Sequence, residues 1–194
     1  MNMPFDAHRD LSDDALLVLF ANGDPTAARL LTLRLTPRVL AFAQRMLGNR
    51  AEAEDVAQEA MLRLWRVARD WRQDQAKVST WLFRVTSNLC TDLLRRRRSV
   101  PLDGIAEPED GQPGALAGMI DQDRARALDQ ALKLLPDRQR QAVILRHLEG
   151  FTNPEIAGMM DIGVEAVESL TARGKRSLAL VLAGRREELG YDAE

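Results

Sequence analysis

Cysteine, aromatic residues and long apolar runs are scarce in this 194-residue sequence, and each scarcity excludes a class of protein. The single cysteine, Cys90, rules out an internal disulfide and any zinc site built from several cysteines. No apolar run is long enough to span a membrane, and the first residues lack the pattern of a signal peptide. Only 5% of the residues are aromatic and β-branched runs are absent, whereas 45% are hydrophobic, which favours packed helices. We therefore expect a soluble, cytoplasmic, helical protein.

Basic residues are missing from one segment, although the chain as a whole carries a net charge of only −2. Residues 99–123 hold six acidic residues and no lysine or arginine, whereas residues 1–98 hold 16 basic against 12 acidic residues. The segment 99–118 also contains three prolines and four glycines, a composition typical of a flexible, solvated linker. This distribution predicts two modules joined by an acidic spacer.

Helical periodicity fills most of the remaining sequence. Ser12 is expected to cap a first helix, and Pro37 should kink or split a second helix that ends at Gly48. The predicted fold class is all-α, with two small helical domains joined by a flexible acidic linker. The expected domains are 1–98 and 121–194, the linker is 99–120, and the expected helices cover 26–47, 51–68, 78–98, 121–135 and 136–147.

The segment 152–178 has the pattern of a helix-turn-helix. Thr152 and Glu155 fit a capping box, and Asp161 stands where the turn needs a left-handed residue. Val167 and Leu170 are expected to face the first helix of the pair, and an ordinary helical hairpin is the alternative to a DNA-binding unit. The exposed side of the second helix is expected to carry Glu165, Ala166, Glu168, Ser169, Ala172, Arg173, Lys175 and Arg176.

The acidic residues on that second helix oppose attraction to phosphate, although a glutamate can accept a hydrogen bond from cytosine N4. We therefore expect this module to bind DNA poorly by itself.

Helix 51–68 should bury one apolar face and expose an opposite face on which Leu62 is surrounded by polar residues. An exposed leucine alone needs no explanation, but one ringed by acids, an amide and an arginine suits protein docking. A magnesium site on Glu52, Asp55 and Glu59 is the alternative, although no second acidic helix completes it. The exposed face consists of Asp55, Gln58, Glu59, Leu62 and Arg66.

Helix 78–98 is expected to carry a basic stripe opposite its apolar face, with Asp92 on the apolar side paired to an arginine. A charge run at a helix end is often only a solvated face, but asparagine and threonine among arginines also suit contacts to nucleic acid. The stripe consists of Arg84, Asn88, Thr91, Arg95 and Arg98. The expected apolar face consists of Val78, Trp81, Leu82, Val85, Leu89 and Leu93.

No set of residues supports catalysis, so we expect neither an enzyme nor a cofactor. His8 stands in an expected tail, and His147 has no serine, cysteine or acid at a catalytic spacing. Cys90 is expected to be a half-buried helix residue rather than a nucleophile.

These segments together resemble the bacterial RNA polymerase sigma factors of the extracytoplasmic-function class. The sequence AEDVAQEAMLRLWR at 53–66 resembles the family's core-binding helix, and STWLFRVTSNLCTDLLRRRR at 79–98 resembles its minus-ten helix. The sequence LPDRQRQAVILRHLEGFTNPEIAGMMDIGVEAVESL at 135–170 resembles its minus-thirty-five helix-turn-helix. The chain departs at Glu165–Glu168, where the family more often carries Gly-Thr-Val followed by a basic residue.

The resemblance implies a function in transcription initiation without covalent chemistry. Leu62 and its polar neighbours would dock on RNA polymerase core, residues 71–77 and the next helix would capture promoter DNA, and the second helix of the helix-turn-helix would read the minus-thirty-five element. An anti-sigma protein would compete for Leu62. A sigma-like decoy that binds a regulator without reading DNA is the alternative, and a metal-dependent nucleotide hydrolase lacks a complete site.

Overall fold

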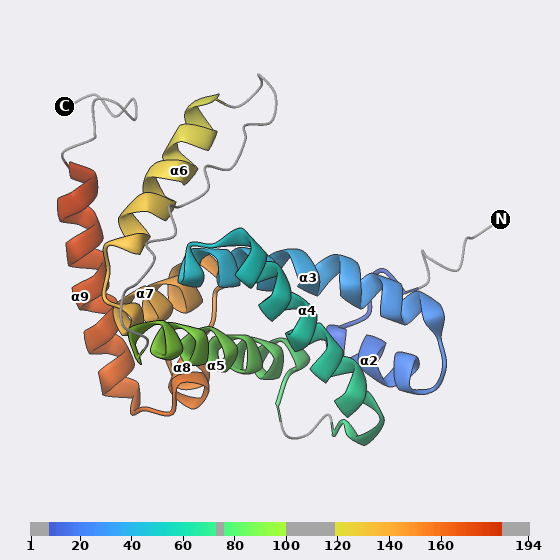
Figure 1. The fold of residues 1–194 in the computed structure, drawn as a ribbon. Coiled ribbons are helices and arrows are strands. Elements are labelled where there is room, and N and C mark those ends of the chain that lie inside the picture. Colours follow the sequence, from blue (N-terminus) through green and yellow to red (C-terminus); the bar gives the residue numbers. More distant parts are fainter. Residues whose placement is uncertain (1–7, 73–75, 100–118, 184–194) are drawn as a thin grey trace. The chain divides into compact units, whose positions relative to one another are not determined.

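The chain is described by a computed structural model that covers residues 8–72, 76–99 and 119–183 (Figure 1). Every regular element in these ranges is a helix, which confirms the all-α prediction. The chain divides into two compact units, Met1–Pro101 and Leu102–Glu194. The expected linker lies mostly on 100–118, outside the described residues, and its last two positions, 119 and 120, belong to a helix. Within the described ranges, no helix combines the length and apolar character that crossing a membrane requires.

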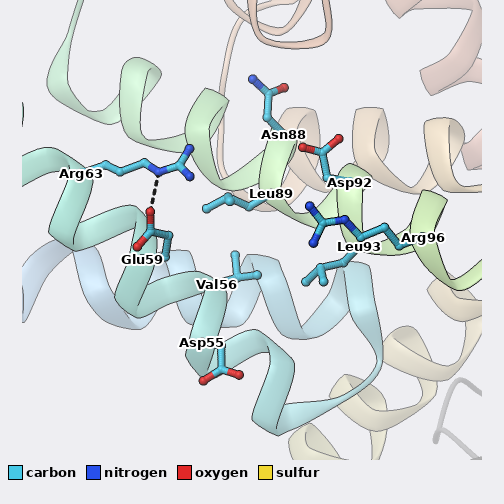
Figure 2. Close-up of a pocket in the computed structure, with 9 residues that line it drawn as sticks. All are labelled: Asp55, Val56, Glu59, Arg63, Asn88, Leu89, Asp92, Leu93 and Arg96. Atoms are coloured by element: carbon cyan, nitrogen blue, oxygen red, sulfur yellow. Dashed lines mark hydrogen bonds and ion pairs between the residues drawn. The ribbon is translucent and has the colours of Figure 1, made fainter.

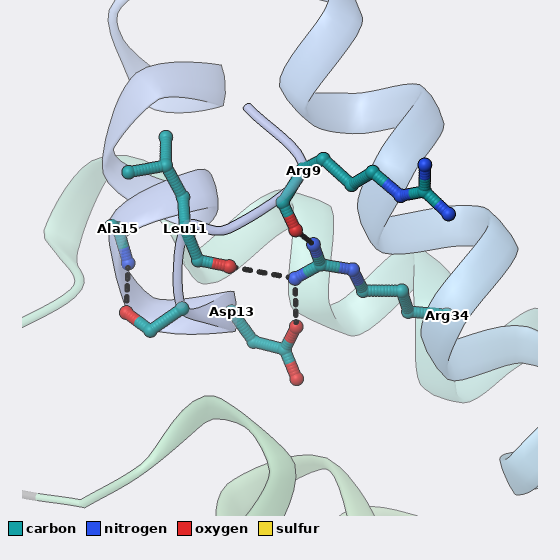
Figure 3. Close-up of polar contacts among 6 residues, drawn as sticks. Arg9, Leu11, Asp13, Ala15 and Arg34 are labelled. Atoms are coloured by element: carbon teal, nitrogen blue, oxygen red, sulfur yellow. Dashed lines mark hydrogen bonds and ion pairs between the residues drawn. The ribbon is translucent and has the colours of Figure 1, made fainter. Parts of the chain in front are cut away.

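The first unit begins with α2 (Asp13–Ala21), and polar contacts fix its start. Ser12 Oγ accepts a hydrogen bond from the Ala15 amide at 3.2 Å, as expected for a capping serine. The Arg34 guanidinium donates to the carbonyls of Arg9 and Leu11 and pairs with Asp13 (Figure 3). An arginine of the next helix therefore secures the segment before α2.

Helix α3 (Pro25–Leu47) is continuous past Pro37, so the predicted alternative that this proline splits the helix is wrong. A proline removes one backbone hydrogen bond and crowds the preceding turn. Buried side chains on both sides of it, including Leu35 and Val39, hold the helix in one piece against the core. Gly48 ends α3 with φ 68°, a left-handed conformation that glycine adopts without strain, as predicted.

Helices α4 (Arg50–Val67) and α5 (Val78–Ser99) complete the core of the first unit with α3, and the short helix η1 (Ala68–Asp70) follows α4. The apolar face of α4 is buried as predicted, except that Trp65 of that face is only half-buried. The buried face of α5 is rotated from the prediction: Phe83, Thr86, Ser87 and Cys90 are buried, whereas four of the six expected residues are only half-buried. Thr86 tolerates burial because its hydroxyl donates to the Leu82 carbonyl at 2.8 Å.

The second unit contains α6 (Met119–Lys133), α7 (Asp137–Val143), α8 (Asn153–Met160) and α9 (Val164–Ala183). The expected helix up to His147 is present, but its last turn, η2 (Ile144–Leu148), is a π-helix. Buried Arg140 donates to the Lys133 carbonyl at 3.3 Å and to the Leu135 carbonyl at 3.1 Å, and it pairs with Asp137 at 3.3 Å. It therefore provides a donor to the free carbonyl at the end of α6.

Helices α8 and α9 form the predicted helix-turn-helix. Thr152 and Glu155 make both bonds of the capping box, and Asp161 adopts φ 52° in the turn. Val167 is buried, as expected for a residue facing α8, whereas Leu170 is only half-buried. Gly174 faces α7 so closely that an added Cβ would lie 2.5 Å from Val143 Cγ2.

Candidate functional site

The outward face of α4 carries an exposed leucine among polar side chains, as the sequence predicted. Leu62 is 41% exposed, and its polar neighbours come from about three turns of the same helix. Glu59 is half-buried and accepts a hydrogen bond from Arg63 Nε at 2.7 Å. That bond, aided by the charges of Arg63 and Arg66, holds the pKa of Glu59 below its usual value. We call this face the α4 ridge; it consists of Asp55, Gln58, Glu59, Leu62 and Arg66.

A groove on the α3 side of the α4 ridge extends the apolar surface around Leu62. Met61 and the half-buried Trp65 contribute from α4, and Leu40 and Thr36 contribute from α3. The buried Thr36 hydroxyl has no hydrogen-bond partner there. A partner seated on Leu62 would therefore also cover apolar surface on α3, which a single exposed leucine would not offer.

A second groove separates the α4 ridge from α5 (Figure 2). Val56, Leu89 and Leu93 line it between the two helices, and charged residues from both helices form its rim. Leu89 and Leu93 are half-buried and reach the surface because the buried face of α5 is rotated from the predicted one. The sequence did not reveal this groove, because it placed both leucines inside the core. The rim consists of Asp55, Glu59, Arg63, Asn88, Asp92 and Arg96.

Two of the three acids suggested as an alternative metal site on α4 are paired with arginines. Glu52 bonds Arg97 of α5, and Glu59 bonds Arg63. Across the described ranges, no group of three His, Cys, Asp or Glu side chains is arranged to hold a metal ion. The arrangement of these side chains therefore does not support the alternative of a magnesium site on α4.

The predicted basic stripe of α5 is exposed at all five positions, Arg84, Asn88, Thr91, Arg95 and Arg98. Arg95 Nη2 pairs with Asp92 Oδ1 at 2.9 Å, so the expected partner of Asp92 is a member of the stripe itself. This pair is exposed and is expected to contribute little to stability, so phosphate can compete for Arg95 at a small cost.

Arg97 lies outside the stripe and points back to the start of α4. Its Nη1 donates to the Leu47 carbonyl at 3.0 Å, and its Nη2 bonds the Glu52 carboxylate. The carbonyl is one of those left free at the end of α3, so a cation there also complements the helix dipole. Nothing in the run of four arginines distinguishes this residue from its neighbours, and the sequence therefore did not identify it.

The outward face of α9 is exposed at every predicted position: Glu165, Ala166, Glu168, Ser169, Ala172, Arg173, Lys175 and Arg176. Glu168 Oε1 accepts a hydrogen bond from Asn153 Nδ2 of α8 at 3.3 Å, which ties one of the two acids to the first helix of the pair. The basic residues follow in the second half of this face. The positive surface of α9 is thus displaced toward its carboxyl end.

The three residues considered as reactive groups have different surroundings. Cys90 is fully buried rather than half-buried, and burial raises the pKa of its thiol to about 12. Partial burial and the charges of Lys175 and Arg146 lower the pKa of His147. His8 contacts Asp24 at 2.9 Å, so it is part of the folded unit rather than of a free tail.

Comparisons with known proteins agree with this arrangement. Residues 31–100 match Sigma-70 region 2, and residues 125–178 match Sigma-70, region 4. The ECF RNA polymerase sigma factor SigM of Mycobacterium tuberculosis is 33% identical over 178 residues, covering 92% of this chain and 88% of SigM. The ECF RNA polymerase sigma factor SigE of Mycolicibacterium smegmatis is 31% identical over 160 residues, covering 80% of this chain and 62% of SigE.

A solved structure shares the fold. It is the sigma factor RpoE of Bartonella quintana, in complex with the anti-sigma factor NepR. It matches with a TM-score of 0.63 and 22% identity, covering 80% of this chain and 96% of that chain.

Two helical units that match sigma regions 2 and 4 define the class as a bacterial sigma factor. The chain belongs to the extracytoplasmic-function (ECF) sigma factors, which are alternative sigma factors that direct transcription.

Proposed function

We propose that the α4 ridge is the surface through which this sigma factor docks on RNA polymerase core. The observation that carries the proposal is Leu62, an exposed apolar side chain surrounded by charged residues and continued by an apolar groove toward α3. Such a combination gives a partner a buried anchor with a polar rim, which is how specific interfaces are built. In this proposal the first unit, taken as residues 1–98, acts as a domain of its own.

The stripe of α5 then contacts the minus-ten promoter region. Its three arginines, Arg84, Arg95 and Arg98, are exposed along one face of the helix with Asn88 and Thr91 among them. Arginines supply phosphate contacts, and the amide and hydroxyl groups add hydrogen bonds to backbone or bases. The stripe lies on α5, next to the helix of the α4 ridge, so one small unit offers both docking and DNA-binding surfaces.

The outward face of α9, in the domain 121–194, reads the minus-thirty-five element. Its cations, Arg173, Lys175 and Arg176, contact phosphate, while Glu165 and Glu168 weaken binding to DNA in general. A weak reader suffices when polymerase core holds it beside a second DNA-binding unit, because linkage raises its effective concentration. The segment 99–120 is the linker in this proposal.

This function requires no cofactor and no catalytic group of the sigma factor, since the polymerase performs the covalent chemistry. It places the protein in the cytoplasm, where core polymerase and promoter DNA are found. By analogy with the RpoE–NepR complex, we infer that an anti-sigma protein covers Leu62 and excludes the polymerase.

The test is transcription with purified polymerase core and a promoter library, followed by sequencing of the transcript starts. The full chain is expected to select one class of promoters. Replacing Arg84, Arg95 and Arg98 by alanine should abolish promoter opening but leave core binding intact. Each lost phosphate contact should also reduce the slope of the logarithm of the DNA-binding constant against the logarithm of salt concentration by about one. Unchanged permanganate reactivity of promoter thymines in this triple variant would refute the role of the stripe. Core binding without any transcript would instead indicate a decoy.

A further inference from the structure

Helix α5 begins with a hydrogen bond from a residue far away in the sequence. The Val78 amide donates to Asp14 Oδ1 at 3.0 Å, across 64 positions of the chain. Asp14 lies in the first turn of α2, and Val78 is the first residue of α5 and is fully buried. The carboxylate therefore supplies an acceptor to one of the free amides at the start of α5.

No residue directly before α5 is suited to this task. Lys77 precedes the helix, and its ammonium group donates hydrogen bonds but cannot accept one. A helix start is normally capped by the side-chain oxygen of Ser, Thr, Asp or Asn at this position. Asp14 supplies an acceptor from another helix, to the amide of the first residue of α5, so the start of α5 depends on the position of α2.

Aromatic packing holds the same turn of α5. Trp81 meets Trp71 edge to face, with ring centroids 6.0 Å apart, and Trp71 directly follows η1. Helix α2 also packs against η1, and its Phe20 contacts Trp65 of α4 with ring centroids 4.7 Å apart. Helix α2 thus contacts the end of α4, η1 and the start of α5 together.

We infer that Asp14 is a positioning residue for promoter DNA: its hydrogen bond to the Val78 amide fixes the first turn of α5 and so places Arg84 at the head of the basic stripe. The inference rests on the proposed role of that stripe. Asp14 lies outside residues 31–100, the part that matches sigma region 2, so it adds a residue of α2 to the machinery of that region.

The experiment compares Asp14→Ala, Asp14→Asn and Asp13→Ala in the full chain. The alanine variant removes the acceptor, whereas asparagine keeps an oxygen that can cap the helix. Asp13→Ala is the matched control, because it removes an equal charge from the same turn of α2 but contacts Arg34 instead of α5. Circular dichroism verifies that each variant is folded.

Two measurements follow. Hydrogen exchange at Val78 should be about fivefold faster in Asp14→Ala, the size expected for a lost cap, and close to wild type in the other two variants. Each variant is then bound to polymerase core and tested for promoter opening by permanganate on a promoter chosen by the transcription experiment. Asp14→Ala should open the promoter several-fold less well at equal core affinity, and Asp14→Asn should restore opening.

The outcomes separate the two proposals. Unchanged exchange at Val78 in Asp14→Ala would overturn the cap. Faster exchange with unchanged promoter opening would make Asp14 a purely structural residue and overturn the positioning role, as would equal loss in Asp13→Ala. If the wild-type holoenzyme opens no promoter, the proposed function fails, and the role of Asp14 in DNA positioning fails with it, whereas the exchange result still decides whether the cap exists.

Discussion

Gly174 lies where α9 crosses α7, and a single methyl group there tests how closely the two helices pack. An ideal Cβ at this position would be 2.5 Å from Val143 Cγ2 and 3.4 Å from the Gln139 carbonyl oxygen. The first contact is far inside van der Waals distance, and the branched valine has little freedom to move away. Gly174→Ala therefore forces the helices apart at the point that sets the position of α9.

Two effects oppose each other in this variant. Overpacking costs about 1–3 kcal/mol, whereas replacing a helical glycine by alanine gains about 1 kcal/mol. Gly158 separates them, because it is exposed in α8 and an added Cβ would meet nothing within 4 Å. Gly158→Ala should therefore stabilise the second unit by up to about 1 kcal/mol. When the changes in unfolding free energy of the two variants are subtracted, the gain in helix propensity cancels. The remainder is the steric cost at Gly174, about 2 kcal/mol.

The assay is thermal unfolding of the full chain followed by circular dichroism at two wavelengths and by tryptophan fluorescence. All three tryptophans, Trp65, Trp71 and Trp81, belong to the first unit, so fluorescence reports that unit alone and should not change. A difference of about 2 kcal/mol corresponds to about 8–16 °C in the melting temperature of a unit of this size. Equal melting temperatures of Gly174→Ala and Gly158→Ala would refute the close packing of α7 and α9.

Three further predictions concern the first unit. Leu62→Glu should weaken core binding at least tenfold without loss of fold, because truncating or charging a buried anchor costs about 2 kcal/mol or more. The affinity is measured by fluorescence titration. Equal affinity of the variant and the wild type would refute the α4 ridge as the docking face. Arg97→Ala should lower the unfolding free energy of this unit by about 1 kcal/mol. The slope of the logarithm of the DNA-binding constant against the logarithm of salt concentration should stay unchanged. A slope reduced by about one would instead show that Arg97 contacts phosphate. Cys90 should react with a thiol reagent at pH 8 about a thousandfold more slowly in the folded chain than in urea, since a pKa of about 12 leaves almost no thiolate. Because the unfolded thiol ionises near pH 9 and the folded one does not, stability should fall as the pH rises from 9 toward 12.

The helices and the turn of the helix-turn-helix could be predicted because their signals are local. A capping box at Thr152, a left-handed Asp161 and a glycine after α3 each act through neighbouring residues. The exposed faces of α4, α5 and α9 could also be predicted, since helical periodicity relates side chains on one helix. The contacts of Asp14 with Val78 and of Arg34 with Leu11 join distant positions, and no local pattern marks them.

The rotation of α5 shows a second kind of failure. Hydrophobicity alone placed Leu89 and Leu93 at the centre of the buried face, but a helix between two neighbours has a wide buried face that smaller residues can fill. Ser87 and Cys90 are small, fully buried residues of α5, which packs against α3 and α4, and the two leucines line the groove beside α4. A surface groove was therefore hidden in the sequence as part of the expected core.

The run of four arginines shows why composition does not assign roles. Successive residues of a helix point about 100° apart, so four neighbours face four directions. Arg95 pairs with Asp92 on the exposed stripe, Arg96 lines the groove beside α4, and Arg97 bonds the Leu47 carbonyl. A run read only as a basic patch would assign all of them to DNA, whereas at least one fixes the helix that carries the others. In the proposed function, phosphate contacts and structural contacts come from adjacent residues of the same type. The dependence of DNA affinity on salt concentration, measured for each single variant, is the property that separates them.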